Sequence, residues 1–299
     1  MIELAHGESR LGVLPETGAA LAFWTHRGVA LLHPVADPNL ADQHGQAVAA
    51  YPLIPYSNRI GDGRFSFGGE SFALAHNFVP ERNSIHGNAW QHPWDIAEQG
   101  EDYVRLTFDH DPSSPAARAQ WPFAYHAALL YRLAGDALEV RITVHNTDRR
   151  PQPVGLGWHP FFPKVAGTRL GFDARSVWHK TPDGLPDGRL RCEGEFLYAP
   201  PRTLDGVDID HCFSGWDQLA TLTWPPSATD EGRSIELAAD ALFGHLVVYV
   251  PPGRDFFAVE PATNMTDAVN HLDIADAGMT ILDPGAHVGG VARLTLRAG

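Results

Sequence analysis

Short segments in which apolar and polar residues alternate recur from one end of the chain to the other, separated by residues that favour turns. In residues 138–144 every second position is Leu, Val or Ile, and the positions between them carry Glu, Arg or Thr. Successive side chains of a strand point to opposite faces, so this period of two predicts strands with one buried face and one wet face.

Turn residues place these strands in hairpins. Residues 64–67 and 70–74 flank Gly68 and Gly69, which supply the positive φ that a primed two-residue turn needs. A second hairpin is predicted from residues 129–133 and 138–144, joined through residues 134–137. Further strands are predicted at residues 11–14, 20–25, 103–108, 234–238, 245–250, 256–260, 279–282 and 292–296.

Helical periodicity is weak, with brief candidates only at residues 115–120 and 266–271, while 29 Gly and 24 Pro punctuate the chain as turns. Antiparallel sheets of this number must pack face to face to bury their apolar sides. The pattern therefore predicts an all-β fold, one large antiparallel β-sandwich that spans residues 1–299 as a single domain.

Charge and cysteine content narrow the function classes. The chain has 22 Lys and Arg against 36 Asp and Glu, and its formal charge of -14 disfavours nucleic acid and anionic lipid as partners. Residues 1–10 lack a basic segment followed by an apolar run, so we expect no signal peptide and no membrane anchor. Two cysteines, Cys192 and Cys212, are too few for a disulfide framework, which favours the cytoplasm.

Two ionisable residues occupy apolar surroundings. Glu260 ends the predicted strand 256–260 and precedes a proline, and an ionised glutamate at such a position is costly unless it is paired or functional. His159 lies between Trp158 and Pro160, where an apolar and rigid setting can tune the pKa of an imidazole. His159 is thus a candidate for catalysis, although a core histidine is an equally good interpretation.

Three further polar residues are weaker candidates when each is taken alone. Arg59 lies in a glycine-rich turn, His86 precedes a glycine that permits close backbone approach, and Asp210 lies in an acidic segment, residues 207–213. For each of them, a structural role is the better interpretation without further evidence. These residues become informative about function through the order of their segments along the chain.

Taken together in this order, the segments resemble the aldose 1-epimerase (galactose mutarotase) family across nearly the whole chain. Family members carry an Asn-Arg-Ile turn before a hairpin, a His-Gly pair, a His-Pro-aromatic-Phe segment, an Asp before a Phe, and a late Glu-Pro, and all five occur here. Asp283-Pro-Gly285 also matches the family's carboxyl end. Residues 260–270 are most similar to a bacterial branch that includes the YphB-like proteins.

The resemblance implies a galactose mutarotase-like supersandwich and a role for each residue. Mutarotation needs an acid and a base at one edge of the sugar ring, and the family pattern assigns the base to Glu260 and the acid to His159. It assigns contacts with the ring-oxygen side to His86 and Arg59 and with sugar hydroxyls to Asp210. It also implies a free aldose as substrate, no cofactor and no metal, in a monomer or homodimer.

Departures from the family pattern concern the substrate. Ala262 stands where the galactose enzymes have Gln, Met265-Thr266 where a Pro is common, Asn88 where a Gly is common and Phe161 where a Tyr is common. Lost polar groups beside a sugar change which hydroxyl pattern is recognised. The sequence therefore leaves the identity of the aldose open. It also leaves open which aromatic residues, Trp90 and Trp158 among them, lie against the sugar.

The sequence also bears on three rival functions. A carbohydrate-binding module would use the same pocket without catalysis, because fold alone does not establish an enzyme. A hexose-6-phosphate epimerase would need basic residues near the phosphate, for which Arg64 and Arg82 are candidates. A metal-dependent sugar enzyme of the cupin type is disfavoured, because no compact His-x-His with a downstream Glu and His occurs.

Overall fold

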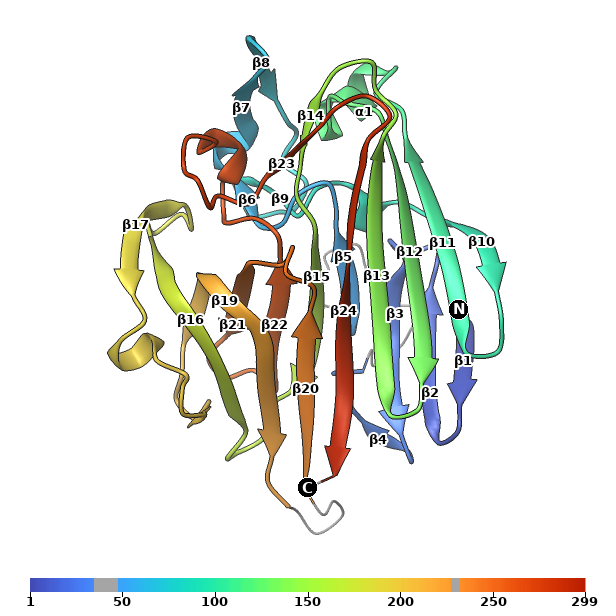
Figure 1. The fold of residues 1–299 in the computed structure, drawn as a ribbon, viewed down its shortest axis with the longest axis vertical. Helices are drawn as coiled ribbons and strands as arrows, with labels where there is room; N and C mark the ends of the chain where they lie inside the picture. Colours follow the sequence, from blue (N-terminus) through green and yellow to red (C-terminus); the bar gives the residue numbers. More distant parts are fainter. Residues whose placement is uncertain (35–47, 227–231, 299) are drawn as a thin grey trace.

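The structure is a computed structural model that describes residues 1–34, 48–226 and 232–298, and strands dominate it (Figure 1). Within these residues, 18 strands belong to one hydrogen-bonded sheet. The sheet folds back into two layers of antiparallel strands, with apolar side chains of both layers forming a common core. The predicted all-β sandwich is therefore confirmed.

The first layer carries His159 on β15 and Glu260 on β22. Its strands pair in the order β1, β2, β3, β5, β15, β22, β21, with the short β4 paired to β3. Their bounds are β1 Ile2–His6, β2 Ser9–Leu14, β3 Ala20–His26, β4 Val29–Ala30, β5 Ala50–Leu53, β15 Gly157–Pro163, β22 Phe256–Ala262 and β21 His245–Val250.

The second layer packs against the first and pairs in the order β10, β11, β12, β13, β24, β20. Its strands alternate as predicted, and on β13 the Leu, Val and Ile positions are buried while the intervening positions are more exposed. The bounds are β10 Asp95–Gln99, β11 Tyr103–His110, β12 Tyr125–Ala134, β13 Ala137–Asn146, β24 His287–Ala298 and β20 Arg233–Ala239.

Two long strands connect the layers. Residues 209–214 of β19 pair with β21 of the first layer, whereas residues 219–224 pair with β20 of the second. Gly215 lies between these stretches with φ 66°, a conformation that glycine adopts without strain. β16 follows β19 around this corner and also pairs with β17 and β18. The bounds are β16 Arg169–Lys180, β17 Pro186–Arg191, β18 Arg202–Thr203 and β19 Ile209–Trp224.

Smaller elements cover one end of the sandwich or support its loops. Three two-stranded sheets are β6 with β9, β7 with β8, and β14 with β23. Their bounds are β6 Arg59–Ile60, β7 Arg64–Phe67, β8 Glu70–Ala73, β9 Ser84–Ile85, β14 Gln152–Val154 and β23 Thr280–Leu282. Within the part of the chain that the structure describes, the helical pieces are α1 Pro115–Gln120 and the 3-10 turns η2 Gly61–Gly63, η3 Ala89–Gln91, η4 Gly194–Phe196 and η5 Ala268–Asn270.

The local predictions have mixed outcomes. Gly68 and Gly69 join β7 to β8 with φ 61° and 83°, which confirms the predicted hairpin. The predicted helix at residues 115–120 is confirmed, and the Ser114 side chain caps it by accepting a hydrogen bond from the Ala117 N–H. The predicted helix at residues 266–271 is wrong in type and extent, because only the 3-10 turn η5 forms there after Asp267, whose φ is 59°.

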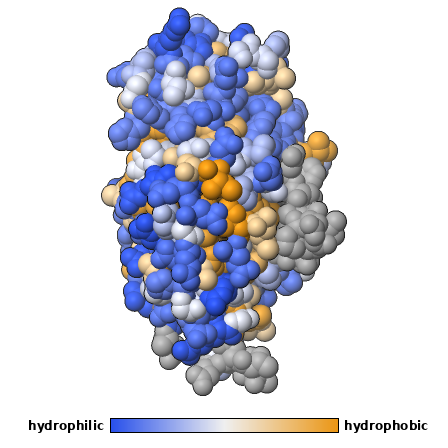
Figure 2. Space-filling model, turned by 90° about the vertical axis from the view of Figure 1, so that its right-hand side faces the viewer, coloured by the Kyte–Doolittle hydropathy of each residue, from blue (hydrophilic) through white to orange (hydrophobic). Residues whose placement is uncertain are grey.

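The outer strands β1 and β10, one from each layer, lie on the same side of the molecule (Figure 1). All five residues of β10 are exposed, and Asp95 and Glu98 give this strand negative charge. Figure 2 shows that the side on which β1 and β10 lie is mainly hydrophilic, with hydrophobic residues gathered near its middle. Charged residues on a terminal strand discourage pairing with a second sheet. None of the described helices is long and apolar enough to cross a membrane.

Candidate active site

His159 and Glu260 lie opposite each other on neighbouring strands of the first layer. β15 and β22 pair antiparallel, with Gly157 opposite Ala262 and Phe161 opposite Ala258, and this register places His159 beside Glu260. Nε2 of His159 lies 3.2 Å from Oε1 of Glu260. Their side chains are 8% and 2% exposed, so the contact is nearly dry.

Strand alternation explains why both side chains leave the common core. On β15, Trp158 and Phe162 pack into the core between the layers, and His159, in the alternate position next to Trp158, points to the opposite face. On β22, Val259 packs into that core, and Glu260 therefore points outward as well. The sequence placed Glu260 at a strand end, which is wrong, because β22 continues to Ala262.

Tyr51 fixes the orientation of the His159 ring. It lies on β5, directly opposite His159 in the register, and the two rings stack with centroids 4.8 Å apart and an interplanar angle of 19°. Tyr51 is fully buried, and burial together with the nearby Glu260 carboxyl raises the pKa of its phenol well above the ordinary value. The ring therefore acts as a neutral wall.

His86 enters the site from a loop that is held in an uncommon conformation. Asn58 and His86 have φ 64° and 63°, values rare for residues other than glycine, and β6 pairs with β9 between them. The backbone N–H of Asn58 donates to Nδ1 of His86 at 3.1 Å. Burial, and then the nearby His159 and Arg59, lower the pKa of His86 well below 6.5, so the neutral ring carries its proton on Nε2.

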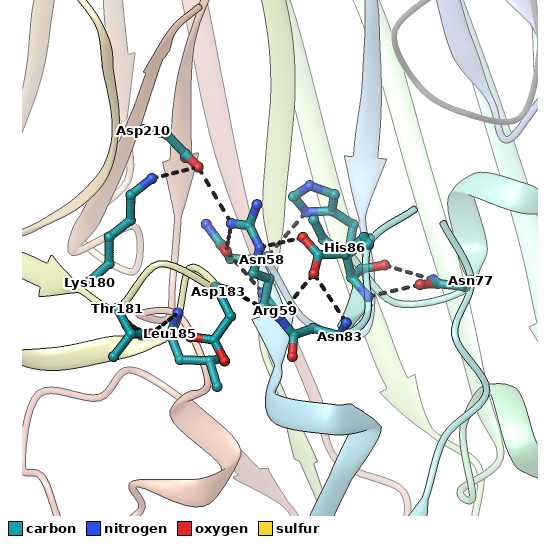
Figure 3. A network of polar contacts seen from close by, with 12 residues as sticks. Asn58, Arg59, Asn77, Asn83, His86, Lys180, Thr181, Asp183, Leu185 and Asp210 are labelled. Atoms are coloured by element: carbon teal, nitrogen blue, oxygen red, sulfur yellow. Dashed lines mark hydrogen bonds and ion pairs between the residues drawn. The ribbon is translucent and has the colours of Figure 1, made fainter. Parts of the chain in front are cut away.

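Arg59 and Asp210 form the charged side of the site (Figure 3). Nη1 of Arg59 lies 3.7 Å from Oδ2 of Asp210, and Lys180 donates to the same oxygen at 2.9 Å. Burial alone would raise the pKa of Asp210, but Arg59 and Lys180 outweigh burial and hold that pKa below the ordinary value. Asp210 is therefore an anion at neutral pH.

All five predicted site residues line one cleft on the outer face of the first layer, which has about 610 Å³ of empty space counting its open mouth. Trp90 contributes to its apolar walls, together with Tyr51, Phe78 and Tyr249. Trp158 does not, because its side chain is 0% exposed in the core. Apolar walls with a few convergent polar groups are typical of sites for small molecules.

Burial sets the protonation of the central pair. It raises the pKa of Glu260 well above the ordinary value, with Asp210 adding to the rise and Arg59 opposing it. It also lowers the pKa of His159 to about 3. When the two side chains are in contact, both are therefore neutral. The carboxyl of Glu260 holds the one proton that the two residues share. Oε2 of Glu260 is buried without a hydrogen-bond partner among the described residues, a cost of about 1–3 kcal/mol that a ligand hydroxyl would relieve.

Three residues of the site were not predicted from the sequence. Tyr51 lies in β5, where four consecutive buried residues hide the alternation. Glu81 lies in a segment rich in polar residues, where it does not stand out, and Lys180 is the last residue of β16, next to the exposed His179. Each acts on a predicted residue, Tyr51 on His159, Glu81 on Arg59 and Lys180 on Asp210. Local sequence gives no indication of such long-range partners.

The two arginines considered for a phosphate lie elsewhere. Arg82 pairs with Asp62 at 3.1 Å, and both side chains are more than 60% exposed. Arg64 is exposed on β7 and borders a separate depression with Phe65 and Phe72. Neither arginine lines the cleft. Among the described residues, no group of three or more His, Cys, Asp or Glu is arranged to hold a metal ion.

Comparisons with known proteins identify the family and the fold of this chain. The family model described as aldose 1-epimerase matches residues 1–295. The uncharacterized protein YphB of Escherichia coli K12 is 25% identical over 279 residues, which cover 88% of each chain, and this confirms the branch indicated by residues 260–270.

Solved structures show the same fold. A galactose mutarotase-like protein from Clostridium acetobutylicum aligns with a TM-score of 0.85 at 20% identity, covering 99% of this chain and 95% of that one. The galactose 1-epimerase of Lactobacillus acidophilus NCFM aligns with a TM-score of 0.79 at 17% identity, covering 99% and 94%. With the family match extending over residues 1–295, the chain belongs to the aldose 1-epimerase family.

Proposed function

We propose that this protein is a mutarotase that interconverts the α and β anomers of a free aldose, with Glu260 as the base and His159 as the acid. The observation that carries the proposal is the direct contact between these two side chains, 3.2 Å apart at the floor of the cleft. The anomeric oxygen and the ring oxygen of an aldose are bonded to the same carbon. A base and an acid that serve both oxygens must therefore lie close together.

The pair completes the cycle without exchanging a proton with solvent. With the ring closed, ionised Glu260 accepts the proton of the anomeric hydroxyl while protonated His159 donates to the ring oxygen, and the carbon–oxygen bond of the ring breaks. The open-chain aldehyde then lies between a protonated Glu260 and a neutral His159, which is the state that burial favours. After rotation about the bond between the first two carbons, both transfers reverse and the other anomer forms.

The remaining residues of the cleft suit a sugar. His86 presents an Nε2–H donor, because its Nδ1 accepts from the backbone. Asp210 has the acceptor capacity that a hydroxyl pair uses, since Lys180 contacts only its Oδ2. Trp90 and Phe78 offer apolar surface to the carbon–hydrogen faces of a ring. This mixture of donors, acceptors and apolar walls recognises a neutral polyhydroxy compound better than an anion.

The pH profile of kcat/KM provides one prediction. Turnover needs one shared proton on the pair, so the acidic limb reflects a second proton that reaches His159, and the basic limb reflects loss of the proton held by Glu260. Burial lowers the first pKa to about 3 and raises the second well above its ordinary value. We expect kcat/KM, which reports the protonation of the free enzyme, to be flat through pH 6.5 in polarimetric assays. A break with its midpoint near 6.5 would show an ordinary histidine in contact with solvent.

The substitution Asp210→Ala provides a second prediction. A carboxylate that binds hydroxyls in both the ground state and the transition state affects binding more than chemistry, so KM should rise by about tenfold or more while kcat changes much less. Asp208→Ala is the matched control, because Asp208 is an exposed acidic residue on the same approach to β19. A loss confined to kcat would assign Asp210 to proton transfer instead.

The proposal as a whole is tested with a panel of freshly dissolved α-aldoses, including D-glucose and D-galactose, in a polarimeter. Protein treated with a chelator should accelerate the change in optical rotation of at least one sugar. Activity that disappears on chelation and returns with one divalent ion would contradict the proposed acid–base mechanism. Sugar binding without acceleration would favour the carbohydrate-binding module.

A further inference from the structure

The guanidinium of Arg59 is held on three sides before any sugar arrives (Figure 3). Its Nε donates to Oε2 of Glu81 at 2.8 Å, and Nη1 donates to Oδ1 of Asn58 at 3.2 Å. Gly184 lies against the group, because a Cβ added at this glycine would stand 2.9 Å from Nε. The remaining nitrogen, Nη2, makes no hydrogen bond or ion pair with the described residues.

Glu81 is itself fixed by the loops around it. Its Oε1 accepts from the backbone N–H of Asn83 at 3.1 Å and from the Asn83 side chain at 3.0 Å. The same Asn83 side chain donates to the carbonyl of Asp183 and accepts from the N–H of Asp62. Both carboxylate oxygens of Glu81 thus have defined partners, and the Glu81 side chain is only 15% exposed.

Two carboxylates compete for this one guanidinium. Glu81 makes a short hydrogen bond with Arg59, whereas the Asp210 oxygen lies 3.7 Å from Nη1, beyond hydrogen-bond length. If Arg59 were free to rotate, it would close on Asp210, and both groups would lose the donors and acceptors that a sugar needs. The bond to Glu81 therefore keeps Arg59 and Asp210 apart.

We propose that Glu81 is a positioning residue that holds Arg59 in the geometry required to bind the sugar. The inference rests on the proposed function, because it assigns Glu81 a part in that same site. Glu81 does not line the cleft and acts only through Arg59. Because Glu81 already orients the guanidinium, less binding free energy is lost in ordering the long Arg59 side chain when a sugar binds.

A double-mutant cycle tests whether Glu81 acts through Arg59. Glu81→Gln keeps the size of the side chain but removes its charge, and it should weaken the affinity for the aldose selected in the panel by about tenfold, with a smaller effect on kcat. In an Arg59→Met background the same substitution should change the affinity by less than about twofold. Arg82→Ala, which removes the exposed neighbouring ion pair, should leave affinity and kcat unchanged. Equal effects of Glu81→Gln in both backgrounds would overturn the proposal.

A measurement that needs no sugar separates this inference from the proposed function. In ¹H–¹⁵N NMR spectra, the Nε–H signal of Arg59, identified by its loss in Arg59→Met, should exchange slowly with water and should exchange much faster in Glu81→Gln. Rapid exchange in the unmodified protein would overturn the proposal, because Glu81 would not hold Arg59. If the panel finds no bound or converted sugar but the Nε–H is protected, the proposed function falls, and with it the sugar-binding role of Glu81, while the contact stands.

Discussion

Replacing Glu260 with Gln should slow anomer interconversion by at least about a hundredfold, because the amide keeps the shape of the carboxyl but cannot accept the proton of the anomeric hydroxyl. Sugar affinity should change far less, since the amide retains a hydrogen-bonding oxygen. Polarimetry gives the rate and calorimetry the affinity. Glu236→Gln on β20 is the matched control, because Glu236 pairs with Arg297 on the opposite layer.

The same substitution should stabilise the fold at neutral pH. Burial raises the folded-state pKa of Glu260 well above its ordinary value, so the unfolded chain loses this proton at a lower pH than the folded one. The contribution of this proton to the free energy of unfolding is therefore fully present below the unfolded-state pKa of Glu260. It is lost as pH rises toward the folded-state pKa. Glu260→Gln removes that loss, and its Tm should exceed that of the unmodified protein at pH 7 but match it near pH 4. A lower Tm at pH 7 would mean that the carboxylate is stabilised in the fold.

His159→Asn should also reduce turnover by at least about a hundredfold, because asparagine cannot donate a proton to the ring oxygen. The double variant Glu260→Gln with His159→Asn should be little slower than either single variant, since a pair that shares one proton acts as a unit. His126→Asn is the control, with its partly exposed side chain on β12 next to Asp109. Losses that multiply in the double variant would show that the two residues act independently.

The fold was predictable because alternation identifies strands that bury one face. β13 shows this, with its apolar positions buried and its polar positions more exposed. β15 was missed as a strand because Gly157–Pro163 is buried on both faces and contains two prolines, so no alternation remains. β10 was missed for the opposite reason, because all five of its residues are exposed.

The five residues that line the candidate site could be selected from the sequence because their motifs are local. Glu260 and His159 stand out where a charged or ionisable side chain interrupts apolar sequence, and family resemblance adds Arg59, His86 and Asp210. What surrounds these residues depends on strand register and on contacts across the chain. The stacking of Tyr51 on His159 requires β5 to pair with β15, about a hundred residues away in sequence, and no local rule gives that pairing.

Proton transfer between the side chains of Glu260 and His159 and the oxygens of an aldose can be measured by NMR exchange spectroscopy at anomeric equilibrium in D₂O. We expect exchange peaks between the α and β anomeric protons. The exchange rate should grow with protein concentration, and the peaks should disappear in Glu260→Gln. We expect no deuterium at the first two carbons, because protons move only between oxygen and the two side chains. A bound sugar whose anomers exchange no faster than in buffer, or deuterium at carbon, would contradict this mechanism.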